Sequence, residues 1–205
     1  MPEALRIGVL ASGEGTTLQA VLDASRAGEL GAEVAIVISN NSNAGALRRA
    51  NASGVLTRHF SSKTHPDPSE LDQSICAALA DARVGLVLLA GFMKKLGPQT
   101  LQAFARRIIN THPALLPKFG GHGMYGMNVH RAVVAAGERQ SGATVHVVEP
   151  EYDTGPIIAQ CVVDVIEGDS PEQLAERVQA GERVLLVDVI RDIARGVHPL
   201  PLDVR

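Results

Sequence analysis

Tryptophan is absent from this chain, cysteine occurs twice, and aromatic residues make up only 3% of the 205 positions. Both cysteines, Cys76 and Cys161, lie among apolar neighbours, which favours buried reduced thiols over a disulfide framework or a nucleophile. No apolar run approaches the ~20 residues needed to span a bilayer. The N-terminus lacks the charged-then-apolar profile of a signal peptide. These absences predict a cytoplasmic protein with no membrane partner.

The charge balance gives no sign of a polyanionic partner. The formal net charge is −3, and no basic block is interleaved with aromatic residues, so nucleic-acid binding is not expected. Positive charge at Lys94, Lys95 and Lys118 still allows a small anionic ligand, because local charge governs what a pocket binds. A hydrophobic fraction of 45% fits a single globular domain over residues 1–205.

The order of apolar runs predicts an α/β protein. Buried strands are expected at residues 6–11, 33–39, 56–60, 86–90 and 107–110. Helices are expected after residue 17 and at 44–53, 69–81 (capped by Ser69), 97–105, 129–136 and 171–195 (capped by Ser170, with Pro171 at the first position). This alternation indicates an open, mostly parallel twisted sheet with helices on both faces. Two β-branched runs, 142–148 and 157–165, predict an antiparallel addition near the C-terminal part.

A glycine-containing turn, residues 12–17, lies between the first strand and the first helix. Such turns bind phosphates on the N–H groups of the following helix. A dinucleotide fingerprint is disfavoured, because its third glycine would fall at Leu18 and its acidic ribose ligand is replaced by Asn40 and Asn41. A single phosphate on Gly15, Thr16 and Thr17 fits better, although a tight turn that binds nothing is the alternative.

Asn110 and His112 stand at the carboxyl end of a strand expected in the middle of the sheet. Alternate residues of a strand point the same way, so the carboxamide can donate a hydrogen bond where the imidazole acts as acid or base. Asp153 lies in a later turn between two prolines, and an acid fixed there can orient the imidazole. The alternative for Asp153 is a simple turn-forming residue.

A metal centre is not expected. His122, His130 and His146 could be drawn as a ligand set, but their spacing matches no metal signature, and no cysteine or paired acid joins them.

Residues 109–117 and 146–160 together resemble the phosphoribosylglycinamide formyltransferase family, folate-dependent enzymes of de novo purine synthesis. Residues 12–19, 89–93 and 168–170 also match its pattern, so the resemblance covers nearly the whole chain. It implies a formyltransferase fold with a nucleotide-binding half, 1–110, and a folate-binding and catalytic half, 111–205. It also implies transfer of the formyl group of 10-formyltetrahydrofolate, the co-substrate, to glycinamide ribonucleotide, without a metal, by a monomer or homodimer.

The resemblance assigns a role to each matching residue. Asn110, His112 and Asp153 would be the catalytic trio, with Asn110 and protonated His112 donating to the developing oxyanion and Asp153 raising the pKa of His112. The implied ligand contacts are Gly15, Thr16 and Thr17 on the phosphate, Arg107 on an anion, Glu182 on the glycinamide substrate, and Met93, Lys94, Lys95, Leu96 and Asn110 on the folate.

Several positions depart from the commoner family pattern. Thr17 replaces a usual asparagine and Lys94 a usual arginine, and Pro68 stands where some members have a basic folate-contacting residue. The loop around His122 is longer and richer in glycine than in many members. These departures affect ligand contacts rather than the reaction.

Three other functions are alternatives to the one that the resemblance implies. The hydrolase that releases formate usually has a second histidine where this chain has Pro113, and an N-terminal regulatory domain for which a first strand beginning at Arg6 leaves no room. The methionyl-tRNA formyltransferase carries a C-terminal RNA-binding domain, and a negative net charge argues against tRNA. A non-catalytic nucleotide-binding module would not need Asn110, His112 and Asp153 together.

Overall fold

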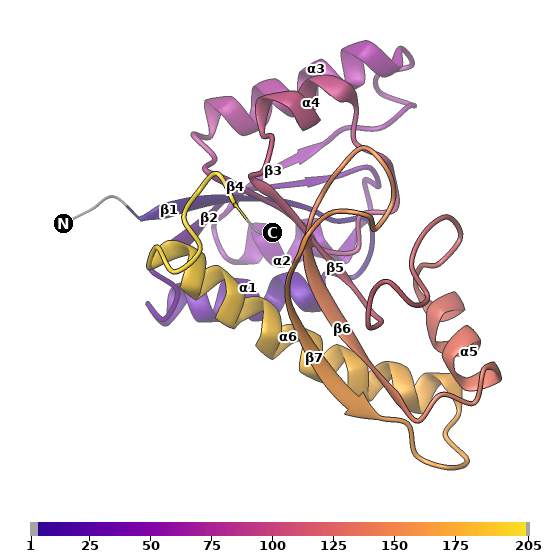
Figure 1. The fold of residues 1–205 in the computed structure, drawn as a ribbon. Helices are drawn as coiled ribbons and strands as arrows, with labels where there is room; N and C mark the ends of the chain where they lie inside the picture. Colours follow the sequence, from indigo (N-terminus) through magenta and orange to yellow (C-terminus); the bar gives the residue numbers. More distant parts are fainter. Residues whose placement is uncertain (1–3, 204–205) are drawn as a thin grey trace.

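The computed structural model describes residues 4–203 as a twisted seven-stranded sheet with helices packed against it (Figure 1). The strands are β1 (Leu5–Leu10), β2 (Ala32–Ser39), β3 (Leu56–His59), β4 (Leu86–Leu89), β5 (Ile108–His112), β6 (Gln140–Val147) and β7 (Ile157–Asp164). The helices are α1 (Thr16–Arg26), α2 (Gly45–Ala52), α3 (Pro68–Asp81), α4 (Pro98–Ala103), α5 (Met127–Ala135) and α6 (Pro171–Ala194).

The sheet changes from parallel to antiparallel at β5. The strand order is β3-β2-β1-β4-β5-β6-β7. Neighbours from β3 to β5 are parallel, whereas β6 pairs antiparallel with both β5 and β7. The prediction of a mostly parallel sheet with an antiparallel addition near the C-terminus is therefore confirmed.

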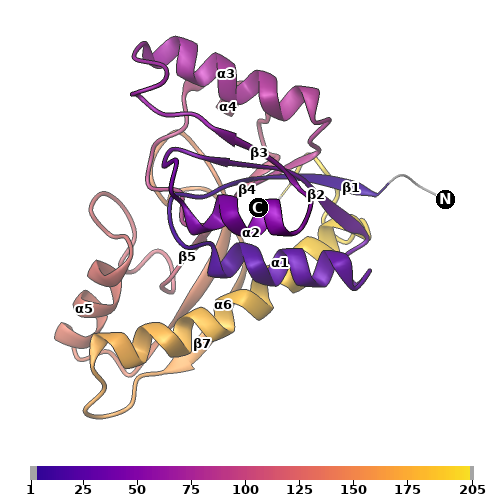
Figure 2. The ribbon, with the colours of Figure 1, turned by 180° about the vertical axis from the view of Figure 1, so that it is seen from behind.

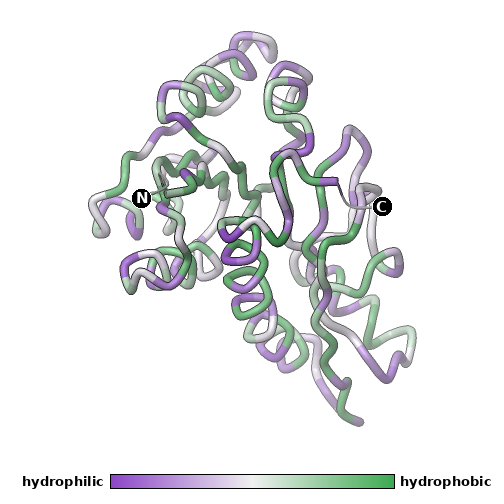
Figure 3. Tube along the Cα trace, turned by 60° about the vertical axis from the view of Figure 1, so that its left-hand side comes forward, coloured by the Kyte–Doolittle hydropathy of each residue, from purple (hydrophilic) through white to green (hydrophobic). Residues whose placement is uncertain are grey.

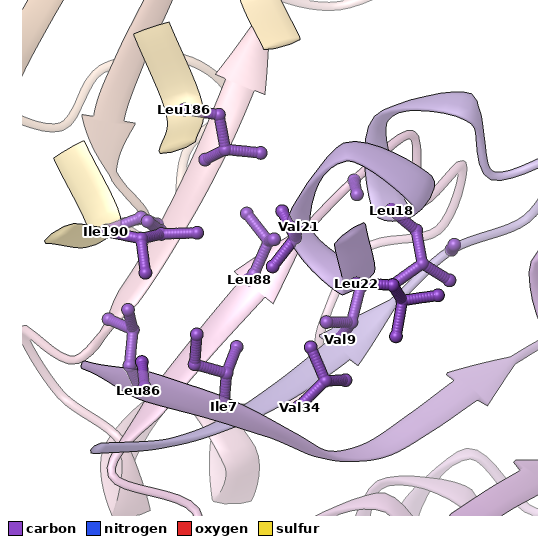
Figure 4. Close-up of a cluster of buried hydrophobic side chains, with 14 of the residues drawn as sticks. Ile7, Val9, Leu18, Val21, Leu22, Val34, Leu86, Leu88, Leu186 and Ile190 are labelled. Atoms are coloured by element: carbon purple, nitrogen blue, oxygen red, sulfur yellow. The ribbon is translucent and has the colours of Figure 1, made fainter. Parts of the chain in front are cut away.

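Helices cover both faces of the sheet, as predicted. Figures 1 and 2 show α3 and α4 on one side and α1, α2 and α6 on the other. The core on the α1 side joins strands β1 and β4 to two helices through Ile7, Val9, Leu86, Leu88, Val21, Leu22, Leu186 and Ile190 (Figure 4). A second core lies between the sheet and the α3–α4 pair. Central strands enclosed on both faces need apolar side chains in both directions, and all four residues of β4 are buried and apolar. Figure 3 shows hydrophobic stretches of chain in the interior of the molecule.

The helix boundaries differ from the prediction at α3 and α5. The N-cap of α3 is Asp67, whose carboxylate accepts from Ser69 N–H at 2.7 Å, so the prediction of Ser69 as cap is wrong. Pro68 occupies the first turn instead, where its missing N–H costs nothing. Helix α5 begins two residues early, at Met127 rather than 129. The predicted cap of α6 is confirmed, because Ser170 and Gln173 form a capping box.

No helix within residues 4–203 has both the length and the apolar character required to cross a membrane.

Helix α4 has no capping side chain of its own and borrows one from α3. The Asp72 carboxylate, in a residue only 4% exposed, accepts from Gln99 N–H at 2.7 Å, from Thr100 N–H at 3.1 Å and from the Thr100 hydroxyl at 2.6 Å. A Cβ at Gly97 would lie 2.2 Å from Asp72 Cγ, so the close approach requires glycine. Asp72 therefore fixes α4 and the segment before it against α3.

We expect Asp72→Ala to lower the free energy of unfolding by about 2–3 kcal/mol, because buried donors lose a charged acceptor. Urea denaturation measures the change. Asp81→Ala, an exposed acid at the end of the same helix, is the matched control and should stay within about 0.5 kcal/mol of the unmodified protein. Equal losses in the two variants would contradict the capping role.

Candidate functional site

The candidate site lies where β5 ends against β6. Asn110 pairs with His146, and His112 pairs with Thr144, in the antiparallel register. Directly paired residues project from the same face of a sheet, so Asn110, His112 and His146 share one face. The expected convergence of Asn110 and His112 is thus produced by strand alternation, and β6 brings a third polar side chain to them.

His146 orients the Asn110 carboxamide. The Nδ1 atom of His146 lies 2.9 Å from the Val147 carbonyl oxygen, which can only accept, so Nδ1 carries the proton. In the neutral ring Nε2 is then an acceptor, and Asn110 Nδ2 donates to it at 3.1 Å. Asn110 therefore keeps one N–H free for a ligand.

His112 is enclosed by the loop that follows β5. It is 3% exposed, and its Nε2 donates to the Phe119 carbonyl oxygen at 2.7 Å. Its Nδ1 lies 3.5 Å from Asp153 Oδ2. The carbonyl selects the Nε2–H tautomer, and the carboxylate faces the nitrogen that would take a second proton.

Asp153 connects both histidines to the loop. Its Oδ1 lies 3.5 Å from His146 Nε2, and its Oδ2 accepts from Gly121 N–H at 2.8 Å. Burial would raise the pKa of Asp153, but the polar contact with His146, the hydrogen bond from Gly121 N–H and the nearby imidazole of His112 outweigh burial and lower it. Asp153 is therefore an anion at neutral pH.

Burial lowers the pKa of His112, and the Asp153 charge opposes this only in part. The expectation that Asp153 raises this pKa is correct for that interaction, but removing the ring from water has the larger effect and sets the net direction. His112 is consequently held neutral, with a proton on Nε2.

A hollow that is open to solvent lies beside this cluster. Asn110, His146 and Asp153 form its polar end, and Lys94, Lys95 and Leu96 line it from the segment after β4. The Lys95 ammonium lies 5.4 Å from the centre of the Tyr152 ring, across the hollow's rim. Met93, expected in the same pocket, is half-exposed and is joined to the first turn by its N–H, which donates to Ser12 Oγ at 2.8 Å.

The turn 12–17 lies at the same edge of the sheet, on the α1 side. Gly15 has a positive φ of 72°, and a Cβ there would lie 2.7 Å from Ala46 Cα, so only glycine fits. No side chain caps α1, which leaves its first N–H groups available to an anion. Thr16 is exposed at this point. The Thr17 hydroxyl, expected on the phosphate, instead donates to Glu182 Oε1 at 2.9 Å.

Glu182 comes from α6 and is 7% exposed. It reaches the same edge of the sheet, where it also accepts from the Thr111 hydroxyl at 3.2 Å. Thr111 stands between Asn110 and His112, so its side chain points to the opposite face of β5. The site therefore has two sides: the hollow on the β5 face that carries Asn110, and the turn 12–17 with Glu182 on the other.

Arg107 is not brought to this site. It precedes β5, at the opposite edge of the sheet, where its guanidinium donates to the Ala103 carbonyl and stacks on Phe104 at 5.0 Å. The three histidines weighed as a metal set do not converge either, and the residues from 4 to 203 contain no group of three or more His, Cys, Asp or Glu arranged to hold a metal ion.

Sequence reasoning missed His146, Thr111 and the main-chain groups of Phe119 and Gly121. A signal for His146 existed in its strand-like neighbourhood, but its use required the register between β5 and β6. Main-chain contacts leave no signal in residue identity.

Comparisons with known proteins find relatives over nearly the whole chain. Residues 5–190 match the family described as "Formyl transferase". The chain is 37% identical over 191 residues to phosphoribosylglycinamide formyltransferase of Haemophilus influenzae, covering 93% of this chain and 88% of that protein. The crystal structure of glycinamide ribonucleotide transformylase 1 from Symbiobacterium toebii is similar with a TM-score of 0.89 and 40% identity, over 96% of this chain and 90% of that one.

A plant relative is longer than this chain. The chloroplastic phosphoribosylglycinamide formyltransferase of Arabidopsis thaliana is 38% identical over 190 residues, which are 92% of this chain but 65% of the plant protein. The chain thus spans slightly less than two thirds of that relative.

We expect Asp153→Asn to lower the pKa of His112 further, because the substitution removes a negative charge that favours the protonated ring. NMR titration of the His112 ring resonance measures this shift. Glu151→Gln removes an exposed carboxylate from the same turn and should leave the titration unchanged. Identical His112 titrations in Asp153→Asn and the unmodified protein would contradict the coupling.

Proposed function

Because the chain belongs to the formyl transferase family, we propose that it transfers the formyl group of 10-formyltetrahydrofolate to the amine of glycinamide ribonucleotide, a step of purine biosynthesis. The products are formylglycinamide ribonucleotide and tetrahydrofolate. The enzyme is a one-carbon transferase with folate as co-substrate.

One observation supports this proposal above all. Asn110, His112 and Asp153 lie together between the hollow and the turn 12–17, which resembles a phosphate-binding turn. Formyl transfer needs a donor to an oxyanion, a group that moves a proton, and two adjoining ligand sites. A nucleotide-binding module would need only the turn.

The chemistry follows from these groups. The substrate amine attacks the formyl carbon, and a C–N bond forms while the carbonyl oxygen gains negative charge. The free N–H of Asn110 and the Nε2–H of His112 donate to that oxygen, and one such preorganised donor is worth roughly 3 kcal/mol of barrier. The bond from the formyl carbon to folate N10 then breaks, and the amine's proton passes to N10. His112 relays it through Nε2, which gives its own proton to N10 and takes the amine's proton in return, while Asp153 orients the ring.

The Phe119 carbonyl oxygen occupies the position that this reaction needs for the oxyanion. It accepts the hydrogen bond from His112 Nε2–H that the oxyanion would accept during the reaction. Binding of both substrates therefore requires the loop carbonyl to move away from His112.

The ligand contacts follow the two sides of the site. The N–H groups of Gly15, Thr16 and Thr17 hold the phosphate, and Glu182 receives a donor of the same substrate. Lys94, Lys95 and Leu96, with Met93 beside them, hold the folate together with Asn110. Arg107 is left out, because it lies at the opposite edge of the sheet.

The proposal also covers the location, assembly and partners of the enzyme. We place the enzyme in the cytoplasm, as a monomer or homodimer, acting on small molecules without nucleic acid, membrane or metal. The lining of the hollow comes from residues 89–101 and 146–153 as well as Asn110, so folate binding draws on both the 1–110 and the 111–205 halves.

We expect Asn110→Ala and His112→Ala each to lower kcat by a factor on the order of one hundred or more, because each removes a donor to the oxyanion. The assay is formation of formylglycinamide ribonucleotide from the two substrates. His198→Ala, beyond the end of α6, is the matched histidine control and should retain full turnover. Near-normal turnover in either site variant would overturn the assignment.

Release of formate without the amine substrate separates transfer from hydrolysis. We expect release to be slow in water alone and product formation to require glycinamide ribonucleotide. Rapid formate release that ignores the amine would make the chain a hydrolase instead.

A further inference from the structure

The two oxygens of the Glu182 carboxylate differ in their hydrogen-bond partners. Both hydroxyl groups that reach it, Thr17 Oγ1 at 2.9 Å and Thr111 Oγ1 at 3.2 Å, donate to the same oxygen, Oε1. The other oxygen, Oε2, has no hydrogen-bond partner between residues 4 and 203. It is also not one of the two fully enclosed unpaired side-chain atoms of that range, His130 Nδ1 and Ser141 Oγ, so it keeps contact with solvent.

The three residues come from three elements that meet at the ligand edge. Thr17 lies in the first turn of α1, next to the candidate phosphate site, and Thr111 lies between the two catalytic residues on β5. A carboxylate bound through one oxygen at this edge of the sheet leaves the other oxygen free to accept a hydrogen bond from an N–H or O–H group of a ligand held there.

We propose that Thr111 and Thr17 are positioning residues, whose hydroxyl groups hold Glu182 Oε1 so that Oε2 receives a hydrogen bond from the phosphorylated amine substrate. This inference rests on the proposed function and deepens it. It also gives Thr17 a role that the commoner asparagine does not suggest, since the Thr17 side chain serves the carboxylate and only its main chain faces the phosphate.

The two hydroxyl groups also favour the charged form of the acid. Burial raises the pKa of Glu182, and the hydrogen bonds from Thr17 and Thr111 oppose it, with a smaller contribution from the adjacent Arg183. Cys161 on β7 is the other titratable neighbour. Loss of a hydroxyl therefore removes both the orientation of the carboxylate and part of the stabilisation of its charge.

Thr111→Val tests the role without changing side-chain shape, since both residues are β-branched and suit a strand. We expect KM for glycinamide ribonucleotide to rise on the order of tenfold, the usual effect of losing a hydrogen bond to a charged group. The kcat and the KM for 10-formyltetrahydrofolate should stay within about twofold, because Thr111 points away from the folate side. Thr111→Ser keeps the hydroxyl that Thr111→Val removes, and its KM should match that of the unmodified protein.

A double-mutant cycle separates positioning from packing. If Thr111 acts through the carboxylate, Thr111→Val should add little to the loss of binding in Glu182→Gln. Direct calorimetric binding of glycinamide ribonucleotide to the folate-free enzyme supplies a second readout. Additive losses, an unchanged KM in Thr111→Val, or failure of serine to rescue would overturn the proposal.

The same experiment distinguishes failure of this inference from failure of the proposed function. If the unmodified protein forms no formylglycinamide ribonucleotide and does not bind the amine substrate, the function itself is wrong. If the unmodified protein is active and only the threonine variants behave unexpectedly, the positioning role alone is wrong.

Discussion

The contacts of the Asp153 carboxylate hold the site together. One oxygen faces His146 on β6, and the other faces His112 on β5 and accepts from Gly121 N–H in the intervening loop. Three segments distant in sequence thus share one anion that the protein largely shields from water. Such a charge is tolerated only when its oxygens are paired, so the turn, the strand ends and the loop constrain one another's positions. The arrangement of Asn110 and His112, the proposed donors to the oxyanion, follows from that mutual constraint.

The sequence predicted those parts of the structure that depend on local patterns. Continuous apolar runs identified the buried strands, and alternation along β5 placed Asn110 and His112 on one face. The turn at Asp153 was weighed against a purely structural alternative, and its proximity to His112 is what the structure adds. The cap of α6 was predicted because Ser170 directly precedes Pro171 at the first helical position, whereas the Asp67 cap of α3 was missed by two positions.

The parts that the sequence did not predict depend on which distant segments meet. His146 became interpretable only through its register opposite Asn110, and the Thr17 hydroxyl turned to Glu182 because α6 passes over that edge of the sheet. Arg107 shows the reverse case: close to Asn110 in sequence, it lies at the other end of the strand. The net lowering of the His112 pKa was not predicted for a similar reason, since enclosure of the ring by the loop around Phe119 cannot be read from neighbouring residues.

The antiparallel register between β5 and β6 has a consequence for how this family can diverge. Inserting one residue within β6 would turn His146 to the opposite face, because side chains alternate, so the spacing of residues along β6 is constrained. The loop that follows β5 is also held in place, because the Phe119 carbonyl accepts from His112 and the Gly121 N–H donates to Asp153. The stretch from His122 to Gly126 carries neither contact. Insertions and deletions should therefore accumulate in that stretch during evolution. Selection for this site would leave related sequences with a variable loop length but a constant residue spacing along β6.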